Sequence, residues 1–324
     1  MRHHRVTSRR DPPVSLRFRA DRTFTIVQLT DVHWKNGEPA DQRTRALIEG
    51  VLDRERPDLV ALTGDIVDGE GSRDPAEAYR QVVAPIEARG LPWAAVFGNH
   101  DDEGRLSRQQ LLEVQRSCRR SLARRGPRGI AGIGNYVLRI GGARDGALAA
   151  VLYFLDSGSY SPNGVGQYAW ITRGQTEWYL RTSRRLAGEH QGRKLPALAF
   201  FHIPLPEHDE VWRTAPCRGS RHEPVCAPSL NSGFFAALVE AGDVMGAFAG
   251  HDHVNDFEGE LHGIRLGYGR ASGFSPYGRE GFDRGARVIE LREGERSFRT
   301  WLRLADGSRV EQAEHEPEAW ARTS

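Results

Sequence analysis

The sequence of 324 residues lacks several features that would place it in a specialised class of protein. It contains no run of 18 apolar residues, which excludes a membrane-spanning helix. Its three cysteines, Cys118, Cys217 and Cys226, are too few to build a disulfide framework. Its net charge of +2 provides no basic excess for binding a nucleic acid. The remaining composition, 39% hydrophobic and 27% charged, is typical of a soluble globular protein.

The N-terminal segment is basic but has no apolar stretch of the kind that a secretory signal requires. We therefore expect a cytoplasmic protein; the alternative is a misassigned start codon that hides a signal. The length fits one large domain, which we expect to occupy residues 21–310. Residues 1–20 are then expected to be a flexible basic tail with a short edge strand, and residues 311–324 an acidic tail.

Short apolar runs alternate with amphipathic stretches along most of the chain, which predicts an α/β fold. Helical periodicity is expected over residues 45–54, 76–88, 106–122, 172–186 and 234–239, with Thr172 as an N-cap. Residues 136–140 and 149–155 bracket a glycine-containing turn and fit a β-hairpin. The C-terminal third is rich in predicted strands, at residues 264–268, 286–291 and 297–304.

Residues 204–232 form a Pro-, Cys- and His-containing stretch that we expect to be a long loop. Loops of this length are usually functional or disordered, and this one separates two of the motifs described below, so we expect a wall or lid of the site. Cys217 and Cys226 flank His222 within it. A disulfide, a metal site formed with His222, and two free thiols all fit this spacing.

Five apolar runs are each followed by residues of the types that bind metal ions. The runs, at residues 24–29, 59–62, 93–97, 197–201 and 244–249, are typical of buried strands. Polar side chains at the ends of buried strands in an α/β sheet point into one crevice. The sequence therefore predicts that seven residues meet at one site: Asp31, His33, Asp65, Asn99, His202, His251 and His253.

Each cluster alone is a weak signal, because Asp, Asn, Gly and His are also common in turns and cores. Their joint occurrence after five predicted strands favours a metal site. Imidazole and carboxylate ligands suit Mn, Fe and Zn, and two such divalent or mixed-valence ions, roughly 3.5–4 Å apart, need a bridging carboxylate. We expect one ion to bind Asp31, His33, Asp65 and His253, and the other to bind Asp65, Asn99, His202 and His251, so that Asp65 bridges.

The ordered motifs D-x-H, G-D-x-x-D, G-N-H-D, H and G-H-x-H resemble those of the calcineurin-like metallophosphoesterase superfamily. The segments FGNHDDEG, FFHIPLPE and GHDHVNDF are similar to a branch of bacterial phosphohydrolases and purple acid phosphatase 28/29-like proteins. The resemblance implies a four-layer α/β/β/α sandwich with two mixed sheets, and the ligand assignment given above. It also implies hydrolysis of phosphoric esters, with in-line attack on phosphorus by a hydroxide that bridges the two ions.

One position departs from the true purple acid phosphatases, which place a tyrosinate ligand three residues after the bridging aspartate. Asp68 stands there in this chain, so we expect neither the purple colour nor a preference for ferric iron. In other members of the superfamily an aspartate at this position orients the histidine of G-N-H. The resemblance gives that role to Asp68 and makes His100 the general acid that protonates the leaving group. A turn role is the alternative for Asp68, and Asp102 is expected to cap the next helix.

The substrate is less constrained by the sequence. Arg270 and Arg284 are candidates for clamping a phosphate, and Tyr268, like Tyr160 and Tyr277, is a candidate for lining the pocket; surface or packing roles compete for each. A phosphomonoesterase or phosphoprotein phosphatase is slightly favoured over a phosphodiesterase. A nuclease is disfavoured by the near-neutral charge, and a catalytically silent scaffold by the complete set of motifs. The motifs indicate no oligomeric state.

Overall fold

The computed structural model describes residues 15–317, which form two β-sheets. The spatial order of the nine-stranded sheet is β1 (Leu16–Arg17), β5 (Tyr136–Gly141), β6 (Leu148–Phe154), β7 (Ala197–Phe200), β9 (Val244–Ala249), β11 (Ile264–Tyr268), β10 (Glu258–Leu261), β8 (Cys217–Arg218) and β15 (Glu314–His315). The order of the six-stranded sheet is β14 (Arg309–Val310), β13 (Phe298–Leu304), β12 (Gly285–Arg292), β2 (Thr23–Leu29), β3 (Leu59–Thr63) and β4 (Trp93–Val96). Both sheets mix parallel and antiparallel pairs.

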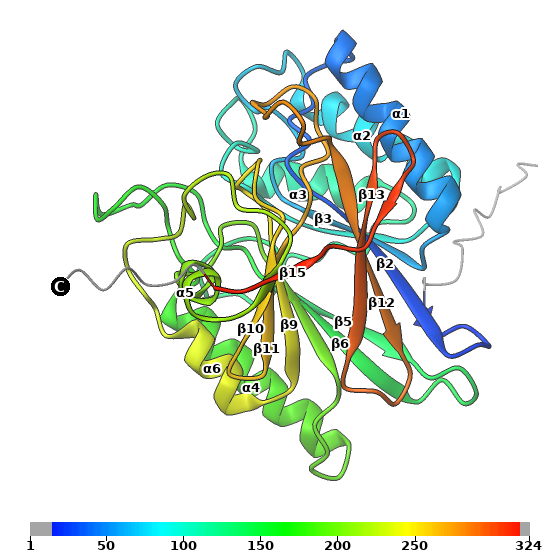
Figure 1. Cartoon of the computed structure of the whole chain (residues 1–324), viewed down its shortest axis with the longest axis vertical. Coiled ribbons are helices and arrows are strands. Elements are labelled where there is room, and N and C mark those ends of the chain that lie inside the picture. The colour runs from blue at the N-terminus through cyan, green and yellow to red at the C-terminus, as the bar shows by residue number, and fades with distance from the viewer. Residues whose placement is uncertain (1–14, 318–324) are drawn as a thin grey trace, which may run out of the picture.

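Six helices cover the outer faces of the two sheets (Figure 1). The six-stranded sheet packs against α1 (Pro39–Glu55), α2 (Pro75–Ala88) and α3 (Arg108–Ser117). The nine-stranded sheet packs against α4 (Arg173–Glu189), α5 (Glu207–Thr214) and α6 (Phe234–Ala241). A third apolar cluster fills the space between the sheets. The predicted four-layer α/β/β/α sandwich is therefore confirmed. None of the helices within residues 15–317 has the length and apolarity needed to cross a membrane.

Strand β2 illustrates how the sequence pattern places the layers. Successive side chains of a strand point to opposite faces. Phe24 and Ile26 accordingly join the apolar cluster between the sheets, whereas Val27 and Leu29 face the helices. All four side chains are fully buried, which explains why the run is continuously apolar rather than alternating.

Most predicted elements appear near their expected positions, and local chemistry explains several of their ends. The helix predicted at residues 172–186 is α4, with Thr172 as N-cap and the Gln175 side chain accepting a hydrogen bond from the Thr172 amide. Helix α1 ends at Glu55, two residues before Pro57. Helix α3 is shorter than its predicted range and begins after the N-cap Ser107, so the cap expected at Asp102 is wrong.

The long loop expected at residues 204–232 is also wrong in part, because it contains helix α5 and strand β8. Both elements are short, so their periodicity is hard to detect in the sequence. The expected terminal tails also contribute strands, since β1 pairs with β5 and β15 pairs with β8. Residues 1–14 and 318–324 of those tails lie outside the described part of the chain.

The strand directions bring the motif residues to one place. Strands β2, β3 and β4 are adjacent and parallel in one sheet, and β7 and β9 are adjacent and parallel in the other. Hydrogen bonds also join the segments that follow these strands, for example from the amide of Asp31 to the carbonyl of Gly64 at 3.1 Å. The same ends of both sheets therefore frame the candidate site.

Candidate metal centre

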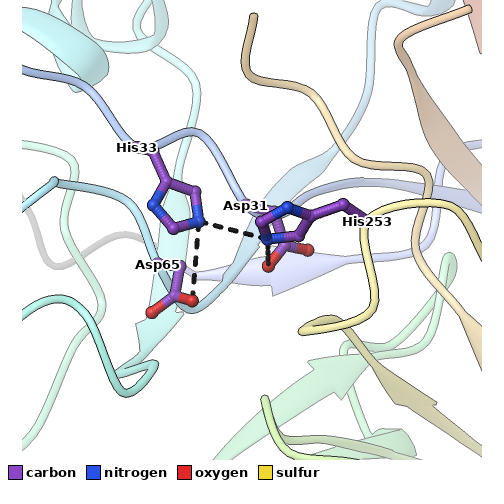
Figure 2. Close-up of side chains that lie close together, drawn as sticks. All are labelled: Asp31, His33, Asp65 and His253. Atoms are coloured by element: carbon purple, nitrogen blue, oxygen red, sulfur yellow. Dashed lines mark hydrogen bonds and ion pairs between the residues drawn. The ribbon is translucent and has the colours of Figure 1, made fainter. Parts of the chain in front are cut away.

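The structure brings together the seven residues that the sequence singled out. They occupy the turns that follow β2, β3, β4, β7 and β9, and every one of them is buried. Ligand atoms of Asp31, His33, Asp65 and His253 all lie within 4.8 Å of one another. Figure 2 shows these four side chains gathered at one place. A second group consists of Asp65, His202 and His251. Asp65 is common to both groups.

Asn99 joins the second group through its side-chain oxygen. Asn99 Oδ1 lies 3.3 Å from His202 Nε2, and His202 Nε2 lies 3.3 Å from His251 Nδ1. In the first group, His33 Nε2 lies 3.3 Å from His253 Nε2 (Figure 2). Two neighbouring groups of side-chain nitrogen and oxygen atoms therefore share the carboxylate of Asp65.

The backbone of this site is locally strained. Positive φ angles occur at Asp31, His33, Asp65 and His251, with values of 52°, 47°, 51° and 80°. Residues other than glycine rarely adopt this left-handed conformation, and it costs about 1 kcal/mol or more at each position. Because of these sharp turns, the four side chains point toward the same place.

Two glycines allow the turns to approach each other closely. A Cβ atom on Gly98 would lie 2.1 Å from Asp65 Oδ1, and one on Gly64 would lie 2.4 Å from His202 Nδ1. Both distances are shorter than van der Waals contact allows. The glycines of the G-D and G-N-H motifs are therefore required so that Asp65 and His202 can occupy the centre.

The donor set fits divalent cations. Asp65 Oδ2 is buried and makes no hydrogen bond, although it lies 3.0 Å from His202 Nε2 and 3.6 Å from His33 Nε2. The buried nitrogen His251 Nε2 also makes no hydrogen bond. An uncompensated polar group of this kind is costly in a protein interior. Imidazole nitrogens and carboxylate oxygens around two points are the ligands that Mn, Fe and Zn prefer.

The electrostatics keep several of these groups in the state that binds a cation. Burial lowers the pKa of His33 to about 4 and that of His251 to about 3, which leaves both rings neutral at pH 7. Burial alone would raise the pKa of Asp31, but the adjacent His253 lowers it to about 2. Burial would lower the pKa of His202, but Asp65 raises it to about 9. A metal ion at this position would therefore displace a proton from His202.

Asp101 organises the turns beneath the centre, and the sequence analysis did not single it out in this role. Its buried carboxylate accepts hydrogen bonds from the backbone amides of Asp65, Ile66, Val67 and Gly98 at 2.8–3.1 Å. It therefore joins the turn after β3 to the turn after β4. The only sequence signal is its position directly after G-N-H.

His100 has a different partner from the one that the resemblance implied. Its Nδ1 lies 2.5 Å from Glu103 Oε2. Asp68 instead accepts a hydrogen bond from the amide of Gly71 at 2.6 Å, and its other oxygen lies 3.8 Å from Lys35 Nζ. The role assigned to Asp68 as the partner of His100 is therefore corrected. The alternative, a turn residue, describes what its side chain does here.

The surroundings of His100 favour its protonated form. Burial lowers the pKa of the ring, but the carboxylates of Asp65 and Glu103 outweigh this effect and raise the pKa above its usual value. Its side chain is 38% exposed, unlike those of the seven metal-ligand candidates. His100 is thus next to Asn99 in the chain and still accessible from solvent.

The three residues predicted to contact substrate are engaged by the protein. Arg270 is buried, pairs with Asp256 and donates to the carbonyl of Asp283 at 2.6 Å. Tyr268 is fully buried, and its hydroxyl donates to Asp252 at 2.6 Å. These contacts correct the expectation of direct substrate binding by both residues, because their polar atoms already have partners in the interior.

Arg284 is also buried, but it lies next to the centre. Its guanidinium donates to the carbonyls of His253, Pro276 and Tyr277, at 3.2, 3.0 and 2.5 Å. This side chain supports the backbone around Tyr277 and His253, and its expected contact with phosphate stays a prediction.

Arg108 is a buried support that the sequence analysis did not identify. It pairs with Asp156, and its Nη2 donates to the carbonyls of Gly98 and Gly158 at 2.7 and 3.0 Å. Its Nε lies 3.2 Å from Asp102, the residue expected to cap a helix. Arg108 therefore fixes the turn that carries Asn99. No short motif precedes it that would have pointed to this role.

The cysteine alternatives left open by the sequence are resolved for the described residues. Cys118, Cys217 and Cys226 are all free thiols. Cys217 is buried in β8, and the Cys226 amide donates to Asp252. His222 stacks edge-on against Phe282 at 5.1 Å, not against a thiol. The 219–226 segment is therefore attached to the loop that carries His251 and His253.

Two mixed sheets that carry a shared aspartate and surrounding imidazoles at their strand ends are the features of a metallohydrolase. A family model described as calcineurin-like phosphoesterase matches residues 24–255. Probable inactive purple acid phosphatase 29 of Arabidopsis thaliana is 38% identical to the chain, over 90% of the chain and 85% of that protein. Phosphatase DCR2 of Saccharomyces cerevisiae is 35% identical, over 87% of the chain and 54% of that protein.

The chain thus belongs to the calcineurin-like phosphoesterase family, as its motifs predicted, and it is a metallophosphoesterase, a hydrolase of phosphoric esters. The fold agrees with this assignment. A crystal structure of a dimetal phosphatase from Danio rerio superposes with a TM-score of 0.57 at 16% identity, covering 91% of the chain and 99% of that protein. Members of this family act on phosphate-ester substrates.

Proposed function

We propose that the protein is a dinuclear-metal-dependent phosphomonoesterase that acts on small phosphate compounds or phosphoproteins. The observation that carries the proposal is the position of Asp65, whose carboxylate belongs to both groups of ligand atoms. A carboxylate shared between two neighbouring sites is the arrangement that a pair of divalent ions requires. His100, which is accessible and adjacent to Asn99, supplies a proton donor beside it.

One ion would be held by Asp31, His33, Asp65 and His253, and the second by Asp65, Asn99, His202 and His251. When bound, such ions lower the pKa of water and neutralise charge on phosphoryl oxygens. The protein contributes the rest of the environment. Burial of all seven side chains excludes bulk water and strengthens each electrostatic contact.

His100 is the general acid in this proposal. Proton donation to the leaving oxygen requires a histidine that is protonated near neutral pH and held in one orientation. The carboxylates of Glu103 and Asp65 favour the protonated ring, and the contact of Glu103 with Nδ1 leaves Nε2 free to donate. Glu103 is therefore a positioning residue, because it acts through His100.

The chain carries every group that this reaction needs, although the Arabidopsis relative named above is called inactive. All seven ligand candidates and His100 are present. Asp68 occupies the sequence position at which purple acid phosphatases have a tyrosinate ligand, and its carboxylate accepts a hydrogen bond from the Gly71 amide in a turn. Without a phenolate ligand the site has no preference for ferric iron, and a pair of divalent or mixed-valence Mn, Fe or Zn ions fits its ligands.

The experiment that tests this function combines metal analysis with a substrate panel. The purified full-length protein is loaded with Mn, Fe or Zn and assayed with p-nitrophenyl phosphate, bis-p-nitrophenyl phosphate and a phosphopeptide. We expect two equivalents of metal per chain and faster hydrolysis of the monoesters. Two bound equivalents without hydrolysis of any member would refute the proposal, and faster hydrolysis of the diester would identify a phosphodiesterase.

A further inference from the structure

Two tyrosine rings are exposed beside the candidate metal centre. Tyr160 and Tyr277 are 43% and 57% exposed, and they are the only aromatic residues among the exposed large hydrophobic side chains in residues 15–317. A tyrosine ring exposed beside a functional site offers its face to an aromatic group of a bound ligand. The position of each ring relative to the ligand residues therefore shows which part of a bound substrate it would contact.

Tyr277 lies on the side of the first ligand group. Its ring stacks on the ring of His253, with centroids 4.2 Å apart and an angle of 30° between the planes. Its hydroxyl donates to Glu223 Oε2 at 2.7 Å, and its carbonyl accepts from Arg284. One face of the ring is thus covered by a ligand candidate, and the ring remains more than half exposed.

Tyr160 lies on the side of the second ligand group. Its hydroxyl accepts a hydrogen bond from Asn99 Nδ2 at 3.3 Å and donates to Glu103. Its ring stacks with Tyr168 at 6.1 Å, and Tyr168 meets His251 edge-on at 4.4 Å. The two exposed tyrosines therefore border opposite ends of the centre, one at His253 and the other at Asn99 and His251.

Both rings are held in place before any ligand binds. Each hydroxyl has a carboxylate partner, Glu223 for Tyr277 and Glu103 for Tyr160. Arg284 also fixes the backbone of Tyr277. Rigid aromatic side chains lose little conformational entropy on binding, so the contacts that they make contribute fully to affinity.

We propose that the exposed ring of Tyr277 recognises a planar aromatic group, so that the preferred substrate is a phosphomonoester with an aromatic ring close to the phosphoryl group; Tyr160 borders the other end of the centre. This inference rests on the proposed phosphomonoesterase function. A phosphoryl group at the centre places the adjoining organic group over the rim of the site, where the tyrosine rings are exposed. Ring stacking distinguishes an aromatic from an aliphatic group of the same size by roughly 2- to 10-fold.

A cationic group such as choline is the main competitor, because tyrosine faces also attract cations. Such ligands are normally enclosed by several rings. Here the exposed rings border opposite ends of the centre, and the carboxylates near them, Glu103 and Glu223, are engaged by the tyrosine hydroxyls. The separation of the two rings disfavours such an enclosure, whereas a flat neutral group needs the face of one tyrosine only.

The test compares benzyl phosphate with cyclohexylmethyl phosphate in the manganese-loaded protein. Both have alkyl leaving groups of similar shape, so a difference between them reports on aromaticity and not on leaving-group chemistry. We expect a KM at least threefold lower for benzyl phosphate with similar kcat. Tyr277→Leu is expected to remove most of this preference, whereas Tyr277→Phe, which retains the ring, keeps it.

Binding provides a second readout that does not depend on turnover. Benzylphosphonate and cyclohexylmethylphosphonate cannot be hydrolysed at their C–P bond, and calorimetry gives their Kd values with the same three proteins. Equal affinities in the unmodified protein, a preference unchanged in Tyr277→Leu, or tighter handling of phosphocholine than of benzyl phosphate would each overturn the inference. Absence of hydrolysis together with an intact phosphonate preference would refute the phosphomonoesterase function but support the aromatic site.

Discussion

His100 Nδ1 lies 2.5 Å from Glu103 Oε2, whereas the side chain of Asp68 is occupied by the Gly71 amide. The pair is formed within one turn, because the two residues are three positions apart. Glu103 also receives the hydroxyl of Tyr160, which in turn accepts from Asn99. A single carboxylate therefore connects the proposed general acid to a metal-ligand candidate through one aromatic side chain.

This connection predicts that Glu103 matters more than Asp68 for turnover. Glu103→Ala is expected to lower kcat for an alkyl phosphate by roughly 10-fold, because the His100 ring loses its orienting partner. Asp68→Asn, the matched control, is expected to change kcat by less than about threefold, since its partner is a backbone amide. Steady-state kinetics with both variants check this. A larger loss in Asp68→Asn than in Glu103→Ala would restore the role that the family resemblance implied.

His100 itself is expected to act on the leaving group. His100→Ala should lower kcat by about 100-fold for an alkyl phosphate and much less for p-nitrophenyl phosphate, because a good leaving group needs no proton. Elemental analysis of the same variant is expected to give an unchanged metal content, since His100 belongs to neither ligand group. Equal losses with the two substrates would argue against an acid role.

Asp65 is expected to determine how many ions bind. Asp65→Asn replaces the carboxylate that both ligand groups share, so we expect fewer than two equivalents of metal per chain by elemental analysis after gel filtration. Asp102→Asn is a suitable control, because Asp102 contacts Arg108 and not the centre. An unchanged stoichiometry in Asp65→Asn would contradict the shared carboxylate.

Arg108 is expected to be a major stabilising residue. Removing it leaves Asp156 as a buried carboxylate without its cationic partner, a change that typically costs about 3 kcal/mol or more. Arg108→Met is therefore expected to reduce the free energy of unfolding by about this amount in urea. Arg173→Met is the control, because that side chain is 91% exposed, and it should change stability by less than about 0.5 kcal/mol. Similar stabilities of the two variants would show that the Arg108 pair is unimportant.

His208 is expected to contribute to the loss of stability in acid. Burial lowers the pKa of this ring to about 4, so between pH 6.5 and 4 the unfolded chain binds a proton that the folded protein does not. Stability due to neutral His208 is present above pH 6.5 and is lost as the pH falls toward 4. Between pH 7.5 and 5.5 the loss is about 1 kcal/mol.

The measurement compares urea unfolding of the unmodified protein and His208→Gln at these two pH values. The variant cannot titrate at this position, so its stability should fall by about 1 kcal/mol less than that of the unmodified protein. Other buried histidines titrate equally in both proteins, and their effects cancel in the difference. An identical pH dependence in the two proteins would contradict a depressed pKa at His208.

The sequence predicted the positions of the buried strands and the convergence of seven residues, because both depend on strong local signals. Five buried apolar runs ended at polar residues, and parallel neighbours in α/β sheets place such ends together. The β11 and β9 ranges agree with the predicted runs at residues 264–268 and 244–249. Periodicity is informative for runs of this length, and it failed for α5 and for two-residue strands such as β8.

The supporting contacts were not predictable in the same way, because they depend on tertiary structure. Arg270 pairs with Asp256, and Arg108 with Asp156. Nothing in the residue types shows that these arginines turn inward rather than toward a substrate phosphate. The partner of His100 was missed for a related reason: the family pattern pointed to Asp68, and the turn at residues 100–103 places Glu103 closer.

The left-handed backbone at Asp31, His33, Asp65 and His251 affects which substitutions would accumulate in the absence of selection for metal binding. Glycine adopts this conformation without steric strain, so replacing His33 or His251 with glycine relieves strain in the folded protein. Asp31 and Asp65 differ, because their carboxylates accept hydrogen bonds from the backbone amides of His251 and His100. A laboratory lineage selected for heat resistance alone is therefore expected to lose the His33 and His251 side chains before those of the two aspartates. The melting temperature of such a lineage would rise while its affinity for metal ions fell. The trade-off between stability and activity would then arise from backbone strain at the ligand residues.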